Sequence, residues 1–512
     1  MVLVVTIYLY LKWKYFSLRG TVPGLKPEFR FGNLRQLGVV SSNNEFIDSL
    51  MHGAEKMQRR YGDIFQFWMG LNHVYVFCRP EYAAHIFGNR QIFDRSDIRR
   101  DTFGLVAEDS LITLIGPKYR RHFKIISPVL RRNRILPQTS IMVDGVDRLI
   151  SIWKERYENN ENAICTCMQS DIRELIVDIF LLITLDYDMG SLKRLLNAAK
   201  HYNTEDKSEP CDFSMAFSIW LDIFKRRSTN GIPFFINYYL LKFDNTYQKA
   251  VKTLEDYVDK IILNCKEKTH PSDKPINLIT SLVSALQTDE VSECLKSESE
   301  KTGLTKKELL GEVLFLFVAG FDTTVNTLSW FIYYVSKKPE IQRKIKEELK
   351  RNGITRETIL DNFDLLNECK YIDCVVKETL RIAPFGLGAF RTVTEDTIID
   401  GVKFRKGENI VCAFSLIQND PRYWKLDPTQ FIPERFYGTD APDANHHPFA
   451  FFPFGGGHRT CIGQDLARLE LKIIIIRLMQ FVTLIDAPGN NGGHHQQSTA
   501  APKEMAISIK FD

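Results

Sequence analysis

Hydrophobic residues recur with the period of an α-helix through much of this chain. Helical periodicity dominates residues 117–342, with polar connectors such as residues 203–210. Apolar residues alternate in residues 64–69 and follow again in residues 74–78, and the turn residues 70–72 between them complete a predicted β-hairpin. Other strand patterns are few. The pattern therefore predicts a mainly α-helical fold with small β-sheets.

The best-defined helix is predicted between residues 305 and 338. Thr305 and Glu308 have the spacing of a capping box, and Pro339 follows the expected end. At a rise of about 1.5 Å per residue, this helix would be about 50 Å long and would cross the whole molecule. Residues 314–330 in its middle are apolar nearly all round, which predicts that the helix is buried.

One polar segment, AGFDTT at residues 319–324, interrupts the apolar middle of this helix. A glycine inside a helix costs about 1 kcal/mol relative to alanine, and a buried carboxylate is costly unless it is paired. Thr323 can donate a hydrogen bond to the carbonyl of Ala319 and open the helix locally. The segment predicts a small groove with a hydroxyl and an acid beside it. The alternative is a kinked core helix in which Asp322 is satisfied.

Residues 454–463, FGGGHRTCIG, place one cysteine, Cys461, just before another predicted helix. The glycines let the backbone turn tightly and approach a flat ligand, and Arg459 offers a charged fork for an anion. Residues 465–481 form the long apolar helix, whose positive N-terminal end would favour a thiolate at Cys461. Such a thiolate can ligate iron. A structural cysteine, or iron ligation by His458, is the alternative.

Composition and charge exclude some classes of protein. The 512 residues contain no linker-like segment, so we predict one large domain at residues 20–512. A net charge of +4 is too small to indicate a nucleic-acid partner. One segment is nevertheless rich in basic residues, which could meet an acidic partner, a membrane surface or solvent: Arg120, Arg121, Lys124, Arg131, Arg132 and Arg134.

The ten cysteines are scattered without a CxxC pair. This spacing fits a reducing compartment and predicts neither a zinc site nor a disulfide framework. Cys165 and Cys167 are separated by one residue but have no matching pair elsewhere in the chain. We therefore expect them to be ordinary surface or core thiols.

The N-terminus is predicted to attach the protein to a membrane. Residues 1–16 read MVLVVTIYLYLKWKYF and are apolar up to Leu11. A full span needs about 20 apolar residues, so this segment crosses a bilayer only if the lysines that follow snorkel. We predict an anchor at residues 1–19. A cleaved signal peptide is less favoured, because no charged region precedes the apolar run.

The pattern Phe-Gly-x-Gly-x-Arg-x-Cys-x-Gly resembles the haem-binding loop of the cytochrome P450 family. Its fixed positions are matched by Phe454, Gly455, Gly457, Arg459, Cys461 and Gly463. The resemblance implies the cytochrome P450 fold, a triangular helical prism that holds haem b between the long central helix and the cysteine loop. It also implies that Cys461 is the axial thiolate ligand and that Arg459 pairs with a haem propionate. A thiolate ligand favours cleavage of the O–O bond.

The polar segment of the long helix resembles the oxygen-binding motif of the same family. By this resemblance, Ala319 and Gly320 line the groove for dioxygen, Thr323 steadies the bound oxygen species and Asp322 relays protons. Many fatty-acid ω-hydroxylases carry Glu where Ala319 stands and form an ester to haem. Its absence implies that the haem is not covalently attached.

A third motif resembles the Glu-x-x-Arg helix of the family. Glu378 and Arg381 lie three residues apart in KETLR, and Arg435 in PERF completes the implied buried charge triad behind the cysteine loop. By resemblance, Arg391 reaches a haem propionate, and residues 385–390 face the substrate. The distal pocket would also include residues from three other places: residues 103–114, Phe315 and Val318.

The chain departs from the family pattern in two places. Where a Trp-x-x-x-Arg helix is expected, Tyr119 and Phe123 stand at the fixed positions. Tyr119 can still donate a hydrogen bond, and the candidate substitutes for the arginine are Arg120, Arg121 and Lys124. A polar insert, GNNGGHHQQST at residues 489–499, is expected to be a solvated loop, and we expect no metal at His494 and His495.

The resemblance implies a microsomal haem-thiolate monooxygenase that hydroxylates an apolar substrate with dioxygen. Because no GxGxxG follows a predicted strand, electrons are expected from a separate NADPH-dependent flavoprotein reductase. The implied location is the endoplasmic reticulum membrane, with the catalytic domain facing the cytosol. Residues 377–463 are most similar to the animal lipid and sterol side-chain hydroxylases, which leaves fatty acid, sterol and xenobiotic substrates open.

Two other functions are compatible with the same loop. One is a haem-thiolate isomerase or dehydratase of oxygenated lipids, and the other is a non-catalytic haem sensor or ligand carrier. The pair Asp322 and Thr323 argues against both, because neither function needs a proton relay.

Overall fold

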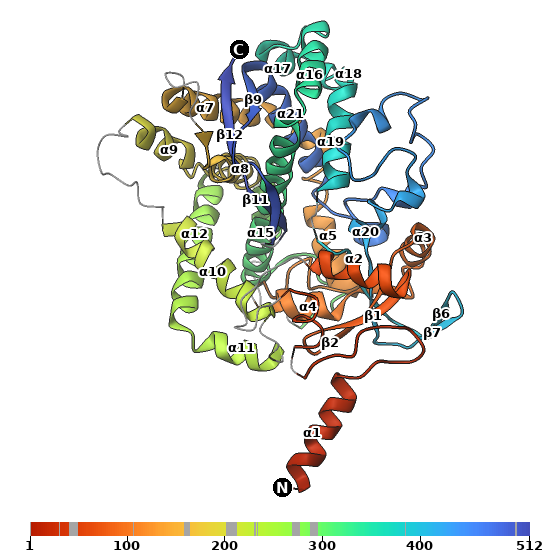
Figure 1. Ribbon diagram of the computed structural model, residues 1–512. Coiled ribbons are helices and arrows are strands. Elements are labelled where there is room, and N and C mark those ends of the chain that lie inside the picture. Colours follow the sequence, from red (N-terminus) through yellow and green to blue (C-terminus); the bar gives the residue numbers. More distant parts are fainter. Residues whose placement is uncertain are drawn as a thin grey trace.

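A computed structural model describes residues 2–29, 31–39, 50–105, 107–157, 164–200, 212–229, 232, 234–268, 277–286, 295–383, 386–496 and 499–512. Helices dominate this part of the chain, and its strands form four small β-sheets (Figure 1). The prediction of a mainly α-helical fold with small sheets is therefore confirmed.

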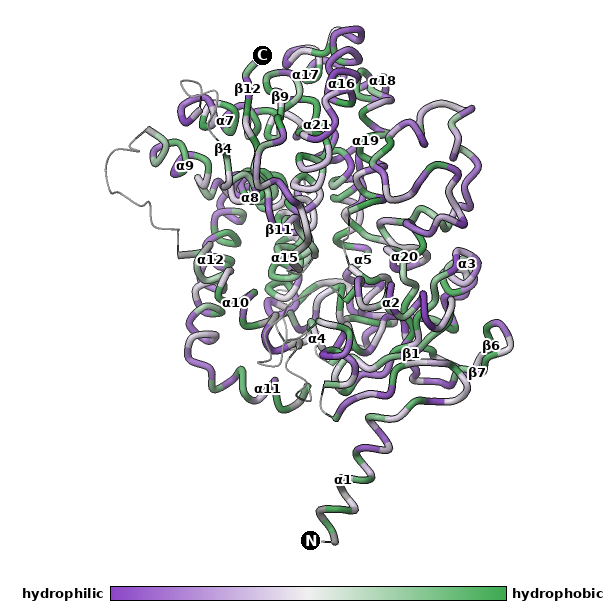
Figure 2. The backbone as a smooth tube through the Cα atoms, viewed as in Figure 1, coloured by the Kyte–Doolittle hydropathy of each residue, from purple (hydrophilic) through white to green (hydrophobic). Residues whose placement is uncertain are grey.

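The long central helix α15 (Lys306–Ser336) organises the helical part of the molecule. Its capping box is confirmed: the Glu308 N–H donates to Thr305 Oγ1 at 3.2 Å, and the Thr305 N–H donates to Glu308 Oε2 at 3.0 Å. In Figure 1, α15 runs vertically through the middle, and Figure 2 shows largely hydrophobic residues along it. Most of its residues are buried, and many of its apolar side chains belong to the main hydrophobic core, as the apolar pattern predicts.

The largest sheet has the strand order β1-β2-β8-β5-β3. The antiparallel hairpin of β1 (Ile64–Met69) and β2 (Asn72–Phe77) is confirmed. The other three strands come from distant parts of the chain: β3 (Phe93–Arg95), β5 (Ala389–Val393) and β8 (Asn409–Cys412). These strands are short and pair non-locally, so their own sequences gave little sign of them.

The other helices and strands surround this framework. The helices are α1 (Val2–Tyr15), α2 (Leu50–Tyr61), α3 (Pro80–Gly88), α4 (Asp97–Gly104), α5 (Gly116–Ile126), α6 (Arg132–Ile135), α7 (Thr139–Tyr157), α8 (Met168–Leu185), α9 (Ser191–Lys200), α10 (Asp212–Thr229), α11 (Phe234–Lys242), α12 (Asn245–Lys268), α13 (Leu278–Ser284), α16 (Pro339–Arg351), α17 (Arg356–Asp361), α18 (Leu365–Glu368), α19 (Lys370–Ile382), α20 (Phe414–Ile417) and α21 (Gln464–Phe481). The strands are β4 (Ile164–Cys165), β6 (Thr397–Ile399), β7 (Val402–Phe404), β9 (Val482–Asp486), β10 (Gly492–Gln496), β11 (Ala500–Glu504) and β12 (Ile507–Phe511).

The first helix, α1, projects from the lower end of the body in Figure 1. Among the described residues, no helix combines the length and apolar character that crossing a bilayer requires. Helix α11 lies at the same end of the molecule (Figure 1), and its apolar side chains include the partly exposed Phe234 and Leu240.

The polar insert near the C-terminus is not a simple solvated loop, so that prediction is wrong. Strand β10 pairs with β11 in an antiparallel hairpin. Thr499, which precedes β11, contacts Asp322 and Asn326 of the central helix. The side chains of His494 and His495 lie outside the described part of the chain.

Candidate functional site

The cysteine loop is closed by one backbone hydrogen bond, from the Cys461 N–H to the Phe454 carbonyl at 2.9 Å. Gly455 and Gly457 have φ angles of 73° and 70°, which side chains rarely tolerate. A Cβ atom on Gly457 would also lie 2.6 Å from the Phe87 carbonyl oxygen. The glycine-rich sequence therefore serves two needs: a left-handed backbone and close packing against α3.

The thiol of Cys461 combines burial with accessibility. Burial raises the pKa of Cys461, although the backbone N–H of Gly463 partly opposes this effect. The residue is nevertheless exposed to solvent. A bound metal cation would favour the thiolate strongly.

Two buried arginines lie beside the loop without enough negative charge to balance them. Arg459 donates to Asp94 Oδ1 at 2.9 and 3.1 Å, but its buried Nη1 has no hydrogen-bond partner in the part of the chain that the structure describes. Among the described residues, Arg391 donates to two carbonyl oxygens, those of Phe390 and Gly456. Burial, together with Arg459, lowers the pKa of Arg391. Because buried charge needs compensation, the pair fits a ligand that carries carboxylates.

His458 also turns toward Asp94. Its Nε2 lies 3.1 Å from Asp94 Oδ1. Burial alone would raise the pKa of Asp94, but His458 and Arg459 outweigh it and hold that pKa well below its usual range. This contact gives His458 a partner on the arginine side of the loop, which argues against the alternative that it ligates iron.

Helix α5 still contacts the cysteine loop although the expected Trp-x-x-x-Arg pattern is missing. The Tyr119 hydroxyl donates to the His458 carbonyl at 3.2 Å, and the Arg459 guanidinium lies 3.5 Å from the centre of the Tyr119 ring. Of the candidate substitutes, Arg120 and Lys124 are exposed. Arg121 bonds Glu308 of α15 instead. Tyr119 therefore provides the contact between α5 and the cysteine loop.

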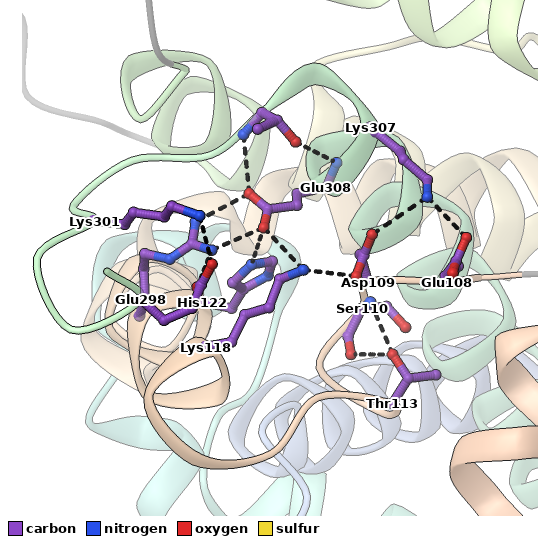
Figure 3. A network of polar contacts seen from close by, with 12 residues as sticks. Glu108, Asp109, Ser110, Thr113, Lys118, His122, Glu298, Lys301, Lys307 and Glu308 are labelled. Atoms are coloured by element: carbon purple, nitrogen blue, oxygen red, sulfur yellow. Dashed lines mark hydrogen bonds and ion pairs between the residues drawn. The ribbon is translucent and has the colours of Figure 1, made fainter. Parts of the chain in front are cut away.

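The opposite side of α5 forms a buried ion-pair cluster with α15, shown in Figure 3. Arg121 Nη2 lies 2.8 Å from Glu308 Oε1, and His122 Nδ1 lies 2.6 Å from Glu312 Oε1. Lys118 joins the cluster through Asp109 at 2.7 Å. Burial disfavours charge on His122, but the two glutamates outweigh it and raise the pKa of His122. The cluster fixes α5, and hence Tyr119, against the central helix.

The middle of α15 carries one partly accessible stripe. Phe315, Ala319, Gly320 and Thr323 are half-buried, whereas nearly all residues between them are buried. The Thr323 hydroxyl donates to the Ala319 carbonyl at 2.9 Å, as the local sequence suggested. Gly320 has a different reason to be glycine, because a Cβ there would lie 2.1 Å from the Phe180 ring of α8. Close packing against α8 is therefore one reason for glycine at this position.

Asp322 lies away from this stripe and is fully buried. Its Oδ2 accepts hydrogen bonds from the Thr499 hydroxyl at 3.2 Å and from Asn326 Nδ2 at 3.4 Å. Asp322 and Thr323 are neighbours in sequence, but the structure gives them different surroundings. Any proton path through Asp322 would therefore run along the contact with the C-terminal hairpin.

Glu470 of α21 is a buried acid that the sequence motifs did not single out. Its Oε2 accepts a hydrogen bond from Thr324 of α15 at 3.3 Å, and its Oε1 has no hydrogen-bond partner among the described residues. Burial raises the pKa of Glu470 to about 8, although the bond from Thr324 opposes the shift. At neutral pH the group is mostly a neutral carboxylic acid. The only sign in the sequence was an acid within an apolar helix.

Glu378, Arg381 and Arg435 meet in the interior, and all three side chains are fully buried. Arg381 Nε and Arg435 Nε lie 2.8 and 2.9 Å from Glu378 Oε2. Asp443, which was not anticipated, lies 2.8 Å from Arg435 Nη1. The cluster is therefore a tetrad with balanced charges. It joins α19 to the segment that precedes the cysteine loop.

Two residues expected in the distal pocket, Phe103 and Phe315, contact each other. The rings of Phe103 and Phe315 lie 6.3 Å apart edge to face, and Val318 is buried. Phe385 and residue 106 lie outside the described residues.

Comparison with known proteins gives one consistent result. Residues 22–491 match the sequence model of the family described as Cytochrome P450. The chain is 25% identical over 452 residues to "Cytochrome P450 4V2" of Mus musculus, covering 87% of this chain and 81% of that protein. It is 24% identical over 470 residues to "Cytochrome P450 4F3" of Homo sapiens, covering 90% and 85%. It is 28% identical over 448 residues to "Putative cytochrome P450 CYP13A6" of Caenorhabditis elegans, covering 82% of each.

Proposed function

The chain belongs to the cytochrome P450 family, and from this premise we propose that it hydroxylates the hydrocarbon part of a lipid, with a fatty acid as the first candidate. Its class is established by the family: a haem-thiolate monooxygenase with the cytochrome P450 fold, non-covalent haem b and dioxygen as co-substrate. The lipid substrate is supported by the apolar residues Phe103, Phe315 and Val318 near the accessible stripe.

One observation carries the proposal: an accessible cysteine in a glycine loop lies beside two buried arginines, Arg391 and Arg459, and of these Arg459 pairs with Asp94 while Arg391 bonds carbonyl oxygens. Cys461 Sγ would hold the iron, and Arg391 and Arg459 would bind the two haem carboxylates. When bound, haem supplies the iron that activates dioxygen for insertion into a C–H bond. Ala319 has no group that could form an ester, which agrees with non-covalent binding.

The residues around the stripe would prepare the substrate and supply protons. The apolar side chains of Phe315 and Ala319 would exclude water and orient the hydrocarbon chain. Thr323 donates its own proton to the Ala319 carbonyl, so its oxygen lone pairs are available to accept a hydrogen bond from a water or a substrate. Asp322, whose Oδ2 accepts a hydrogen bond from Thr499, would relay protons on the helix face that contacts the C-terminal hairpin.

We further propose that electrons come from an NADPH-dependent flavoprotein reductase. The exposed basic residues Arg120, Lys124, Arg131 and Arg134 offer complementary charge for an acidic partner. Attachment to the endoplasmic reticulum membrane through residues 1–19, with the catalytic domain at residues 20–512 facing the cytosol, is supported by the exposed apolar side chains of Leu3 and Leu9 in α1 and Phe243 after α11.

The carbon monoxide spectrum of the reduced protein tests the iron ligand. A thiolate gives a strongly red-shifted Soret band, which we expect to disappear in Cys461→Ser and to persist in the matched control His458→Ala. Persistence in Cys461→Ser would refute thiolate ligation by this residue.

Turnover tests the reaction and the substrate class. The enzyme, reconstituted with a reductase and NADPH, should convert a saturated fatty acid to a hydroxylated product that contains oxygen from labelled dioxygen. Product formed without dioxygen or reductase would favour the isomerase function. Binding spectra without any turnover across fatty acids, sterols and xenobiotics would favour the sensor function.

A further inference from the structure

A second group of reactive side chains lies at the start of α8, outside the haem site. The Sγ atoms of Cys165 and Cys167 are 3.6 Å apart, and Cys167 Sγ lies 3.6 Å from Asp171 Oδ2. Cys165 is buried in β4, where it pairs with Ile507 of β12. Cys167 is half-buried and forms the N-cap of the helix. Two different elements therefore hold the two thiols together.

Three neighbouring groups favour negative charge on Cys167 Sγ, against the nearby carboxylate of Asp171. Arg156 Nη1 lies 3.7 Å from Cys167 Sγ, and the Tyr157 hydroxyl lies 3.5 Å from it. The sulfur also sits at the positive end of an 18-residue helix. These contacts stabilise a thiolate at Cys167 rather than at Cys165.

The pKa values of the two thiols differ in the direction that these contacts favour. The hydrogen bond from Cys165, helped by Tyr157 and Arg156, lowers the pKa of Cys167 to about 7 against burial and the charge of Asp171. The same hydrogen bond, together with burial, raises the pKa of Cys165. Near neutral pH, Cys167 is therefore the nucleophile, while Cys165 keeps its proton until it is needed.

A metal ion fits this cluster less well, although ligand atoms of Cys165, Cys167 and Asp171 lie within 4.8 Å of one another. Both oxygens of Asp171 lie 3.0 Å from Arg156 Nη1, and Oδ2 also accepts from Trp153 Nε1 at 2.9 Å. The carboxylate is already neutralised, and the guanidinium would repel a cation. The same arginine that stabilises the thiolate thus disfavours a metal.

We propose that Cys165 and Cys167 form a redox-active dithiol that reacts with hydroperoxides and closes to a disulfide. The Cys167 thiolate attacks one oxygen of the hydroperoxide ROOH, so that the O–O bond breaks, the sulfur is oxidised to a sulfenic acid and the other oxygen leaves as ROH after taking up a proton. Cys165 then loses its proton and attacks Cys167 Sγ. The S–S bond forms as the S–O bond breaks, and water leaves. Two protein thiols are oxidised and one hydroperoxide is reduced.

The geometry requires only a modest movement for the second step. The sulfur atoms must approach from 3.6 Å to a bond length of about 2.05 Å. Cys167 is accessible enough to meet the hydroperoxide, and Cys165 needs no contact with solvent because it attacks only its neighbour. A small-molecule thiol such as glutathione would restore the dithiol by exchange.

Mass spectrometry tests the dithiol on the full-length, haem-loaded protein, with imidazole saturating the iron so that haem does not consume the oxidant. After one equivalent of tert-butyl hydroperoxide and alkylation with N-ethylmaleimide, we expect a 165–167 disulfide that has lost two hydrogens and cannot be alkylated. Cys369 and Cys412, both buried, serve as internal controls. Full alkylation of Cys165 and Cys167 after hydroperoxide treatment would overturn the proposal.

Variants separate the two roles. In Cys165→Ser, Cys167 should accumulate sulfenic acid that reacts with dimedone, whereas in Cys167→Ser, Cys165 should stay reduced. Oxidation of Cys165 in Cys167→Ser would contradict the assigned order. Stoichiometric zinc that protects both thiols of the wild-type protein would replace the dithiol with a metal site.

The pH dependence of alkylation checks the thiolate without any variant of the cysteines. At pH 7, Cys167 should carry roughly fifteen times as much thiolate as an ordinary thiol with a pKa of about 8.5, and its alkylation rate should have a midpoint near this pH. Arg156→Gln should move the midpoint upward, and the conservative Arg156→Lys should restore most of it. A midpoint above pH 8 in the wild-type protein would refute the thiolate.

Discussion

Replacing Glu378 by Gln tests the buried charge tetrad most directly. Glu378 lies within 2.9 Å of both Arg381 and Arg435, and all three side chains are fully buried. Gln keeps the size of the side chain but removes its charge, which leaves two buried guanidinium groups with Asp443 as their nearest carboxylate. Stranding a buried charge in this way costs about 3–5 kcal/mol. That is a large part of a typical folding free energy of about 5–15 kcal/mol.

The consequence should appear in stability and in haem content together. Arg381 also bonds the carbonyls of Gln418 and Gln430, and Arg435 bonds that of Asp427. These bonds fix the segment that leads to the cysteine loop, so their loss should loosen the loop itself. We expect the urea midpoint, followed by circular dichroism, to fall sharply, and the haem absorbance per protein to drop below half of the wild-type value.

A matched control separates this effect from the loss of any ion pair. Glu347 pairs with Arg343 at 2.6 Å, but their side chains are 57% and 63% exposed. Glu347→Gln should therefore cost about 0.3–0.5 kcal/mol and leave haem content unchanged. If Glu378→Gln behaved like this control, the tetrad would not be needed to support the cysteine loop.

Three further substitutions have distinct expected outcomes. Arg459→Leu removes a charged hydrogen-bond donor worth about 1.5–3 kcal/mol, so haem transfer to apomyoglobin should show roughly 10- to 100-fold weaker binding; unchanged transfer would exclude the arginine from propionate binding. The stability loss of His122→Asn relative to the wild type should be largest below about pH 6.5, the pKa of histidine in the unfolded chain. The raised pKa of folded His122 stabilises the wild type at low pH, and this stabilisation fades as the pH rises through the folded pKa. Urea midpoints at pH 5.5 and 9 check this, and a pH-independent difference would contradict it. Glu470→Gln should gain stability relative to the wild type as the pH rises from about 4.3 to the folded pKa of about 8. In this range the folded wild type keeps a proton on Glu470 that its unfolded chain releases. Thermal midpoints across the range check this, and a pH-independent difference would show that Glu470 is ionised in the folded protein.

Local sequence predicted those features whose partners lie close in the chain. The capping box of Thr305 and Glu308, the hairpin of β1 and β2, and the hydrogen bond of Thr323 each depend on residues at most a few positions apart or joined by a short turn. The pattern around Cys461 is another such local feature, because the glycines that its backbone conformation requires lie within ten consecutive residues. The fold class followed from helical periodicity, which is also a local property.

The features that the sequence did not reveal depend on residues far apart in the chain. His122 and Glu312 are 190 positions apart, and nothing in either neighbourhood indicates that they form a buried pair. Asp443 is only eight positions from Arg435, but it becomes part of the charge tetrad because Arg435 meets Glu378, 57 positions earlier in the chain. Glu470 meets Thr324 across 146 positions. Such contacts follow from tertiary packing and have no periodic signal.

The segment AGFDTT shows how these two levels combine within six residues. The sequence pattern identifies the segment, but its positions have different neighbours in the structure. Thr323 belongs to the accessible stripe, Gly320 to the contact with Phe180, and Asp322 to Thr499 in the C-terminal hairpin. Because those neighbours come from α8 and from the end of the chain, a substitution that alters either element changes the oxygen-binding segment without touching its sequence. The residue types in this helix determine which chemical groups are present. The packing of distant elements determines which of these groups are accessible and which are buried in contacts.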